Sequence, residues 1–273
     1  MQDFADRVAV ITGAGSGIGR ALAEKAAAEG MKVVIADIDV AALEETERIL
    51  KGEGATALAV PVDVADPVSV DRLAQEALDE YGAVHLVFNN AGVGAGTTVW
   101  ESTLADWQRV LGVNLWGVIH GVRTFVPLLL QQEEGHIVNT ASIAGVLPFH
   151  PSGPYQVSTH AVVGLTEHLA VSLKMRNAAV GASVLLPGWV RTNFLASEAH
   201  RPPALSDPIP PGWDDATLRK MQQAVATGMA PERVAERAFE GIREGRLYLF
   251  THPDDKDELA QRLQAMLASI PAQ

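Results

Sequence analysis

Short apolar runs alternate along the chain with longer stretches in which apolar residues recur at helical spacing. The apolar runs predict strands at residues 8–11, 32–36, 57–62, 84–88, 136–140, 180–186 and 247–250. The amphipathic stretches predict helices at residues 18–29, 41–51, 68–81, 104–130, 154–176 and 255–267. Alternation of this kind is typical of βαβ units. The pattern therefore predicts an α/β fold, in which a doubly wound parallel sheet of about seven strands carries helices on both faces.

No internal repeat or low-complexity linker interrupts the alternation, so we expect residues 1–273 to form a single domain. The exception is an insertion at about residues 191–229, where prolines at 202, 203, 208, 210 and 211 disfavour regular elements. It follows the carboxyl end of a predicted strand, which is where open α/β sheets bind ligands. We expect it to form a lid over a binding site, with an ordinary surface loop as the alternative.

Composition narrows the possible functions. Hydrophobic residues make up 48% of the chain and aromatic residues only 5%, as expected for a sheet buried on both faces by aliphatic side chains. The absence of cysteine excludes disulfides, thiolate nucleophiles and zinc–thiolate sites, and the eight histidines show no metal-binding spacing. A net charge of −12 argues against nucleic-acid binding. Because no signal peptide or membrane-spanning run is apparent, we expect a cytoplasmic protein without a membrane partner.

A glycine-rich turn follows the first predicted strand. Thr12 opens the pattern T-G-x-x-x-G-x-G, in which the glycines are Gly13, Gly17 and Gly19. A turn without side chains lets the backbone approach a pyrophosphate that rests on a helix N-terminus. In a βαβ unit with an acid after the second strand, this pattern indicates a Rossmann-type dinucleotide site.

Three further motifs extend the pattern. They are the segment 89–92, which reads Asn-Asn-Ala-Gly, Ser142 within Asn-Thr-Ala-Ser, and Tyr155 thirteen residues later. Together with the glycine turn, these motifs resemble the short-chain dehydrogenase/reductase family over almost the whole chain. The resemblance implies hydride transfer between a nicotinamide cofactor and a small-molecule alcohol or ketone. It also implies a homo-oligomer, a tetramer or a dimer, built on the two long helices that flank the fifth strand.

The acid after the second strand, Asp37, favours NAD over NADP. Its carboxylate can accept hydrogen bonds from the adenosine ribose hydroxyls, and it would repel a 2′-phosphate. No basic residue stands at Ser16 or Ile38, where NADP-preferring relatives often place one. The alternative role for Asp37 is helix capping, for which Asp39 is the better placed residue.

The resemblance implies the remaining cofactor contacts. Asp63 and Val64 resemble the pair that holds the adenine, and the turn from Pro187 to Thr192 resembles the one that clamps the nicotinamide carboxamide. The full set of expected cofactor-binding residues is Gly13, Ser16, Gly17, Ile18, Gly19, Asp37, Asp63, Val64, Asn90, Ala91, Gly92, Tyr155, Pro187, Gly188, Val190 and Thr192.

The resemblance also assigns catalytic roles. Ser142 would hold the substrate oxygen, Tyr155 would exchange a proton with it, and Asn114 would organise a proton-relay water by disturbing its helix. Each has an ordinary structural alternative: a strand-end serine, a half-buried tyrosine and a polar helix residue.

The family's Tyr-x-x-x-Lys motif ends here in Thr159. Positions 155 and 159 share a helix face, so a lysine there would lower the pKa of the tyrosine and hold the nicotinamide ribose. Threonine carries no charge. We count Thr159 among the catalytic positions and expect general acid/base assistance, typically worth about 10²–10⁴-fold, to be reduced.

An apolar pocket is expected for the substrate. Its candidate walls are Val93, Ile143, Phe149, Trp189, Phe194 and Trp213, with His150 as a candidate polar contact. This lining favours a hydrophobic or aromatic alcohol or ketone, although most ligand pockets are apolar.

Two functions follow. The first is an NAD-dependent oxidoreductase that interconverts a secondary alcohol and a ketone. The alternative is a catalytically disabled dinucleotide-binding protein, a sensor or a scaffold; the retained Ser142, Tyr155 and Asn114 speak against it. Non-redox chemistry of the halohydrin dehalogenase type is a poor match, because those enzymes carry arginine at the lysine position and lack the glycine turn, which this chain keeps.

Overall fold

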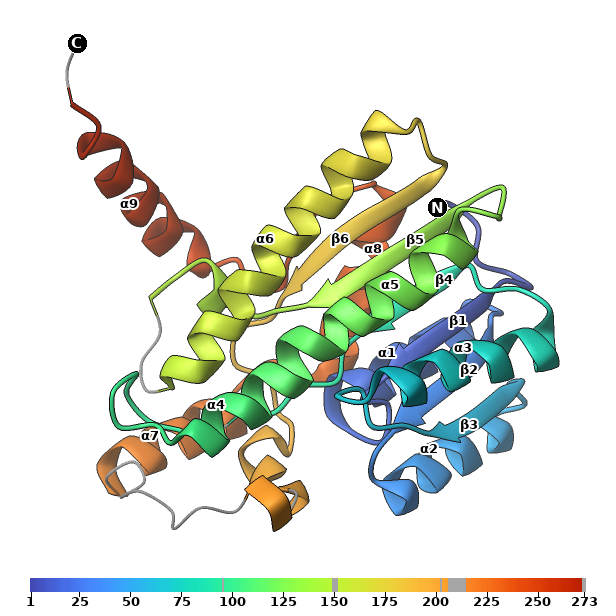
Figure 1. Cartoon of the computed structure of the whole chain (residues 1–273), viewed down its shortest axis with the longest axis horizontal. Coiled ribbons are helices and arrows are strands. Elements are labelled where there is room, and N and C mark those ends of the chain that lie inside the picture. The colour runs from blue at the N-terminus through green and yellow to red at the C-terminus, as the bar shows by residue number, and fades with distance from the viewer. Residues whose placement is uncertain (95, 149–151, 202, 206–214, 272–273) are drawn as a thin grey trace.

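A seven-stranded parallel sheet in the order β3-β2-β1-β4-β5-β6-β7 forms the centre of the molecule (Figure 1). The computed structural model describes residues 1–94, 96–148, 152–201, 203–205 and 215–271. The strands are β1 (Val8–Thr12), β2 (Lys32–Asp37), β3 (Ala57–Pro61), β4 (Leu86–Asn89), β5 (Gly135–Thr140), β6 (Val180–Leu186) and β7 (Tyr248–Phe250). The predicted doubly wound parallel sheet is therefore confirmed.

Helices cover both faces of the sheet. They are α1 (Gly17–Ala28), α2 (Val40–Gly52), α3 (Pro67–Tyr81), α4 (Leu104–Leu111), α5 (Gly117–Leu129), α6 (Gly153–Met175), α7 (Asp215–Ala226), α8 (Pro231–Arg243) and α9 (Asp255–Ala268). Helices α1, α2 and α8 supply the core on one face, and α3, α5 and α6 supply it on the other. Successive β1 residues alternate between these cores: Ala9 and Ile11 face one and Val8 and Val10 the other. Double-sided burial explains why the strand reads as a continuous apolar run.

Three helical predictions need correction. The continuous helix expected at residues 104–130 is divided into α4 and α5 by a π-helical turn, Gly112–Trp116. The insertion at 191–229 is not irregular throughout, because it contains α7 and two short 3₁₀ segments, Phe194–His200 and Pro203–Leu205. Helix α8 was not predicted at all, although it packs against α1 at the centre of one core.

Two further features complete the fold. Helix α9 extends away from the sheet and helix layers, with the C-terminus at its far end (Figure 1). In the part of the chain that the structure describes, no helix combines the length and apolar character that a membrane crossing requires.

Candidate functional site

A cleft of about 610 Å³ lies along the carboxyl ends of the strands, lined by the segments that follow β1 to β6. Every residue that the sequence predicted to contact the cofactor lines this cleft. The predicted catalytic residues line it too, as do the described substrate-wall residues Val93, Ile143, Trp189 and Phe194. Phe149, His150 and Trp213 lie outside the described residues. Residues far apart in the sequence thus converge because parallel strands end at one edge of the sheet.

The glycines after β1 are required by close backbone approaches. Gly13 and Gly17 have φ values of +68° and +53°, a left-handed region that side chains disfavour. A Cβ on Gly19 would lie 2.0 Å from the carbonyl oxygen of Gly13, and one on Gly13 would lie 2.8 Å from Cα of Ala91. The turn therefore places bare backbone at the N-terminus of α1, as pyrophosphate binding requires.

Asp37 at the end of β2 is held by two backbone amides. Its Oδ2 accepts a hydrogen bond from the N–H of Gly15 at 2.8 Å, and its Oδ1 accepts one from the N–H of Asp39 at 3.0 Å. The cap of α2 is Asp39, whose side chain accepts from the N–H of Ala42 at 3.1 Å, as predicted. Gly15 is not one of the predicted cofactor-binding residues, yet a Cβ there would lie 2.9 Å from Oδ2 of Asp37. Gly15 therefore joins the glycine turn to the carboxylate.

Thr12 organises the adjoining wall. Its Oγ1 accepts hydrogen bonds from the N–H groups of Asn90 and Ala91, at 2.9 and 3.1 Å, and its carbonyl accepts from Nδ2 of Asn90 at 3.1 Å. These bonds fix the segment after β4 against the glycine turn. Further along the cleft, the carbonyl of Val64 lies 2.9 Å from Nδ1 of His120 on α5. Sequence reasoning placed Thr12 in the glycine motif but did not predict these contacts, and it missed His120, because their partners are distant in the chain.

Ser142 and Tyr155 meet at the other end of the cleft. The Ser142 hydroxyl donates to the carbonyl of Pro187 at 3.3 Å and accepts from the N–H of Ala144 at 3.2 Å. Burial raises the pKa of the Tyr155 phenol above its ordinary value of 10, and a hydrogen bond between this phenol and the Ser142 side chain offsets the rise only in part. The two hydroxyl groups are therefore adjacent, and the phenol keeps its proton at neutral pH.

Asn114 lies in the π-helical turn, so the helix disturbance expected at this residue is present. Its Oδ1 accepts from the N–H of Val93 at 2.8 Å, and its Nδ2 donates to the Val93 carbonyl at 3.0 Å and to Ser158 Oγ at 3.2 Å. The side-chain amide thus fixes the loop after β4 to α6, two residues beyond the Asn90-Ala91 segment. π-Helical turns occur frequently at functional sites.

Thr159 does not replace the missing charge. Its side chain is buried, and Oγ1 lies 3.1 Å from the Tyr155 carbonyl and 3.0 Å from the Gln156 carbonyl on the same helix. A threonine hydroxyl has one hydrogen, which the helix backbone already engages. Among the described residues, neither Lys nor Arg contributes to the pKa of Tyr155.

Apolar and aromatic side chains surround the substrate end. The Phe194 ring packs edge-on against the Tyr155 ring, with centroids 5.3 Å apart. Met221 and Val225 of α7 also line the cleft. These two residues were not predicted, because the segment that carries them was expected to be irregular.

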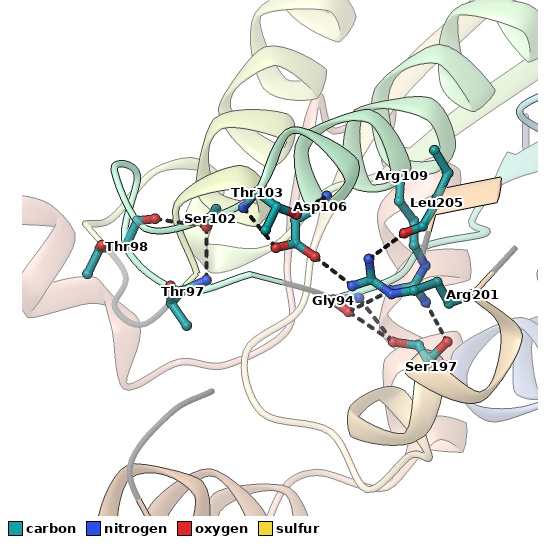
Figure 2. Close-up of polar contacts among 10 residues, drawn as sticks. All are labelled: Gly94, Thr97, Thr98, Ser102, Thr103, Asp106, Arg109, Ser197, Arg201 and Leu205. Carbon is teal, nitrogen blue, oxygen red and sulfur yellow. Dashed lines mark hydrogen bonds and ion pairs between the residues drawn. The ribbon is translucent and has the colours of Figure 1, made fainter. Parts of the chain in front are cut away.

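Four residues hold the segment after β6 to α4, and we call them the clasp: Asp106, Arg109, Ser197 and Arg201 (Figure 2). The buried Asp106 carboxylate pairs with the Arg201 guanidinium at 2.5 Å. Arg109 donates to the Ser197 carbonyl at 2.5 Å, and the Ser197 hydroxyl bonds to Gly94 at 3.2 Å. Burial alone would raise the pKa of Asp106, but hydrogen bonds from Arg201 and Thr103 outweigh it and hold that pKa below its ordinary value.

No group of three or more metal-ligating side chains occurs in the described part of the chain. The polar groups of the cleft include the glycine-turn amides, the Asp37 carboxylate, and the hydroxyls of Ser142 and Tyr155. Such an arrangement can bind a dinucleotide along the sheet edge and transfer a proton at the far end.

Comparison with known proteins gives consistent matches over the chain. The sequence model of the family described as short chain dehydrogenase matches residues 7–202. The crystal structure of a short chain dehydrogenase/reductase from Burkholderia phymatum in complex with NAD is 46% identical, with a TM-score of 0.95, covering 100% of this chain and 99% of that one.

Two proteins of similar sequence carry descriptions of activity. A "CLA biosynthesis dehydrogenase/reductase" of Lactiplantibacillus plantarum is 34% identical over 272 residues, which is 98% of this chain and 95% of that protein. A "C alpha-dehydrogenase" of Sphingobium sp. is 32% identical over 274 residues, covering 99% of this chain and 88% of that protein.

Proposed function

The chain belongs to the short-chain dehydrogenase/reductase family, and from this membership we propose that it is an NAD-dependent oxidoreductase that interconverts a secondary alcohol and a ketone. One observation carries the proposal. The hydroxyls of Ser142 and Tyr155 lie together in the same cleft whose other end is formed by the glycine turn and Asp37. A proton-transfer pair and a dinucleotide cradle in one cleft match the two halves of an alcohol–ketone interconversion.

The residues present fit the cofactor. The glycine turn leaves no room for side chains where backbone must approach a pyrophosphate, as the 2.0 Å approach at Gly19 illustrates. The Asp37 carboxylate lies in the cleft, where it can accept from ribose hydroxyls and repels a 2′-phosphate. NAD is therefore favoured over NADP, and the similar Burkholderia phymatum protein was crystallised with NAD.

NAD, when bound, supplies the hydride acceptor for alcohol oxidation, and its reduced form supplies the hydride for ketone reduction. In this proposal Ser142 donates a hydrogen bond to the substrate oxygen and orients it toward Tyr155. During oxidation Tyr155 removes the hydroxyl proton, and during reduction it returns a proton to the same oxygen. Because burial raises the pKa of Tyr155, the residue is ready to donate at neutral pH and becomes a base only under alkaline conditions.

The segment after β6 is proposed to act as the lid over the substrate. Phe194 stands against Tyr155, and the clasp fixes the following residues to α4. The surrounding Val93, Ile143 and Met221 favour a hydrophobic or aromatic substrate.

A second candidate function is a dinucleotide-binding protein without turnover. Thr159 favours it, because its hydroxyl is engaged by its own helix and leaves the phenol without a cationic neighbour among the described residues. Retention of the Ser142–Tyr155 pair favours the enzyme, since cofactor binding alone requires neither hydroxyl.

Calorimetric titration with NAD and NADP, followed by nicotinamide absorbance assays, tests the proposal. The assays use aryl and alicyclic secondary alcohols with NAD, and the matching ketones with NADH, from neutral to alkaline pH. NAD binding with turnover that Tyr155→Phe abolishes would support the enzyme. NAD binding without turnover over the whole panel would support the second candidate, and failure to bind either nucleotide would refute both.

A further inference from the structure

His252, just beyond β7, contacts the turn that follows β6. Its Nδ1 accepts a hydrogen bond from the N–H of Gly188 at 3.1 Å, and its Nε2 lies 3.1 Å from the carbonyl oxygen of Trp189. The imidazole therefore bridges two consecutive residues of the Pro187–Thr192 turn. Neither the motifs of the chain nor the proton-transfer pair accounts for this contact.

The two bonds specify the protonation of the ring. A backbone N–H can only donate and a carbonyl can only accept, so Nδ1 is unprotonated and Nε2 carries the hydrogen. The neutral Nε2–H tautomer is the one form that satisfies both partners. The Thr251 hydroxyl also lies 2.8 Å from Nδ1, the nitrogen that accepts from Gly188.

The fit between ring and turn is close. A Cβ on Gly188 would lie 2.9 Å from Nδ1 and 3.0 Å from Cγ of His252. A side chain at position 188 would therefore push the imidazole out of hydrogen-bonding position. The glycine and the histidine act as a pair.

The same turn is anchored on its other side to the proton-transfer end of the cleft. The carbonyl of Pro187 accepts from the N–H of Ile143 at 2.9 Å and from the Ser142 hydroxyl at 3.3 Å. The carbonyl of Trp189 also accepts from the N–H of Met229 at 2.9 Å. Loss of the imidazole removes a side chain that holds both Gly188 and Trp189, while the anchors at Pro187 remain.

We propose that His252 is a positioning residue that sets the Pro187–Thr192 turn for the nicotinamide end of the cofactor. The inference rests on the proposed NAD-dependent function and adds to it. His252 does not contact the reacting atoms; it acts through the backbone of Gly188 and Trp189. Its effect is therefore confined to the nicotinamide half of the dinucleotide, because Asp37 and the glycine turn hold the other half.

Binding of NAD and of ADP-ribose, measured by calorimetry on the protein alone, separates these halves. ADP-ribose keeps the adenosine, pyrophosphate and second ribose but lacks nicotinamide. In His252→Ala the Kd for NAD should rise about tenfold, as expected for two neutral hydrogen bonds, while the Kd for ADP-ribose stays within about twofold. Gly188→Ala should show the same selective loss.

Two further variants separate hydrogen bonding from packing. In His252→Asn the side-chain oxygen can accept from Gly188 and should recover part of the NAD affinity, whereas His252→Phe fills the space without hydrogen bonds and should not. His168→Ala, an exposed site on α6, is the matched control and should change neither Kd. Thermal melts of every variant identify any that fail to fold.

Three results would overturn the inference. They are an unchanged NAD affinity in His252→Ala, an equal loss of NAD and ADP-ribose affinity in a folded variant, and wild-type affinity in His252→Phe. If the unaltered protein binds neither NAD nor ADP-ribose, the proposed function itself fails and this inference falls with it. That outcome is distinct, because it appears before any variant is compared.

Discussion

Replacing Thr159 by lysine should shift the pH range in which Tyr155 acts as a base. Thr159 lies one helical turn after Tyr155 and lines the same cleft, so a longer side chain at this position extends toward the phenol. The change costs the hydrogen bonds from Oγ1 to the carbonyls of Tyr155 and Gln156, at 3.1 and 3.0 Å. Those carbonyls keep their helical partners, so we expect the fold to survive.

The size of the effect follows from the protonation of Tyr155. Burial raises its pKa above the ordinary value, so the phenol is almost wholly protonated at neutral pH. Each unit by which the pKa is lowered increases the ionised fraction at neutral pH about tenfold. A cation within about 4–6 Å lowers an acidic group's pKa by about one to three units. Alcohol oxidation at neutral pH should therefore become about 10- to 1,000-fold faster in Thr159→Lys. The two proteins should converge at alkaline pH.

The assay is the initial rate of NADH formation at saturating NAD and alcohol, measured across neutral and alkaline pH. Thr159→Met, which has comparable length without charge, is the matched control and should retain the alkaline profile of the unaltered protein. A rate plateau near neutral pH in the unaltered protein would refute the reasoning, because another group would then be activating Tyr155. Equal gains in the Met and Lys variants would show that shape, and not charge, is responsible.

Three other outcomes are expected. Asp37→Ser should weaken NAD binding about tenfold and narrow the preference over NADP, and titrations showing an unchanged ratio of the two affinities would contradict the role of Asp37. Burial, aided by the N-terminal ammonium, lowers the pKa of His136 from 6.5 to about 3. Between these pH values the unfolded chain binds a proton at His136 and the folded chain does not, so the free energy of unfolding decreases as the pH falls below 6.5. In urea unfolding, protonation of His136 should lower the free energy of unfolding at pH 5 by about 2 kcal/mol relative to neutral pH, and this decrease should be absent from His136→Gln. Asp106→Asn removes the charge that pairs with Arg201, so thermolysin should cleave the segment after β6 about tenfold faster, and an unchanged cleavage rate would show that the clasp does not hold that segment.

The cofactor end of the cleft could be predicted because its residues lie next to strand ends. Three apolar runs end at Thr12, Asp37 and Asn89, the last residues of β1, β2 and β4, and the parallel sheet brings the residues that follow them together. The clasp and the contact between His252 and Gly188 could not be predicted in this way. Asp106 and Arg201 are 95 residues apart, and Gly188 and His252 are 64 apart, so no local pattern records either pair.

The missed helices had unequal signals. Helix α8 buries Val234, Ala238 and Ile242 at helical spacing after a proline in its first turn, so its pattern was present in the sequence. In α7, Leu218, Met221 and Val225 also recur at helical spacing, but Met221 is the one buried residue among those described. The prolines that precede α7 led to the expectation of an irregular segment, and the weaker helical pattern behind them was missed.

The π-helical turn between α4 and α5 contains one residue more than a regular α-helix would need to connect them. Val110 and Leu129 are both fully buried and stand 19 residues apart, which is about 5.3 turns of an ideal α-helix. The buried residues between them make five steps: Asn114, Val118, Gly121, Phe125 and Leu129. The π-helical turn accommodates the extra third of a turn, so the buried residues of α4 and those of α5 face the same side. A chain shorter by one residue in this turn would therefore keep the same helix packing as one regular helix, and would give up only the wide turn that holds Asn114 against Val93. The extra residue therefore determines the position of Asn114 in the site, whereas the packing of α4 and α5 does not depend on it.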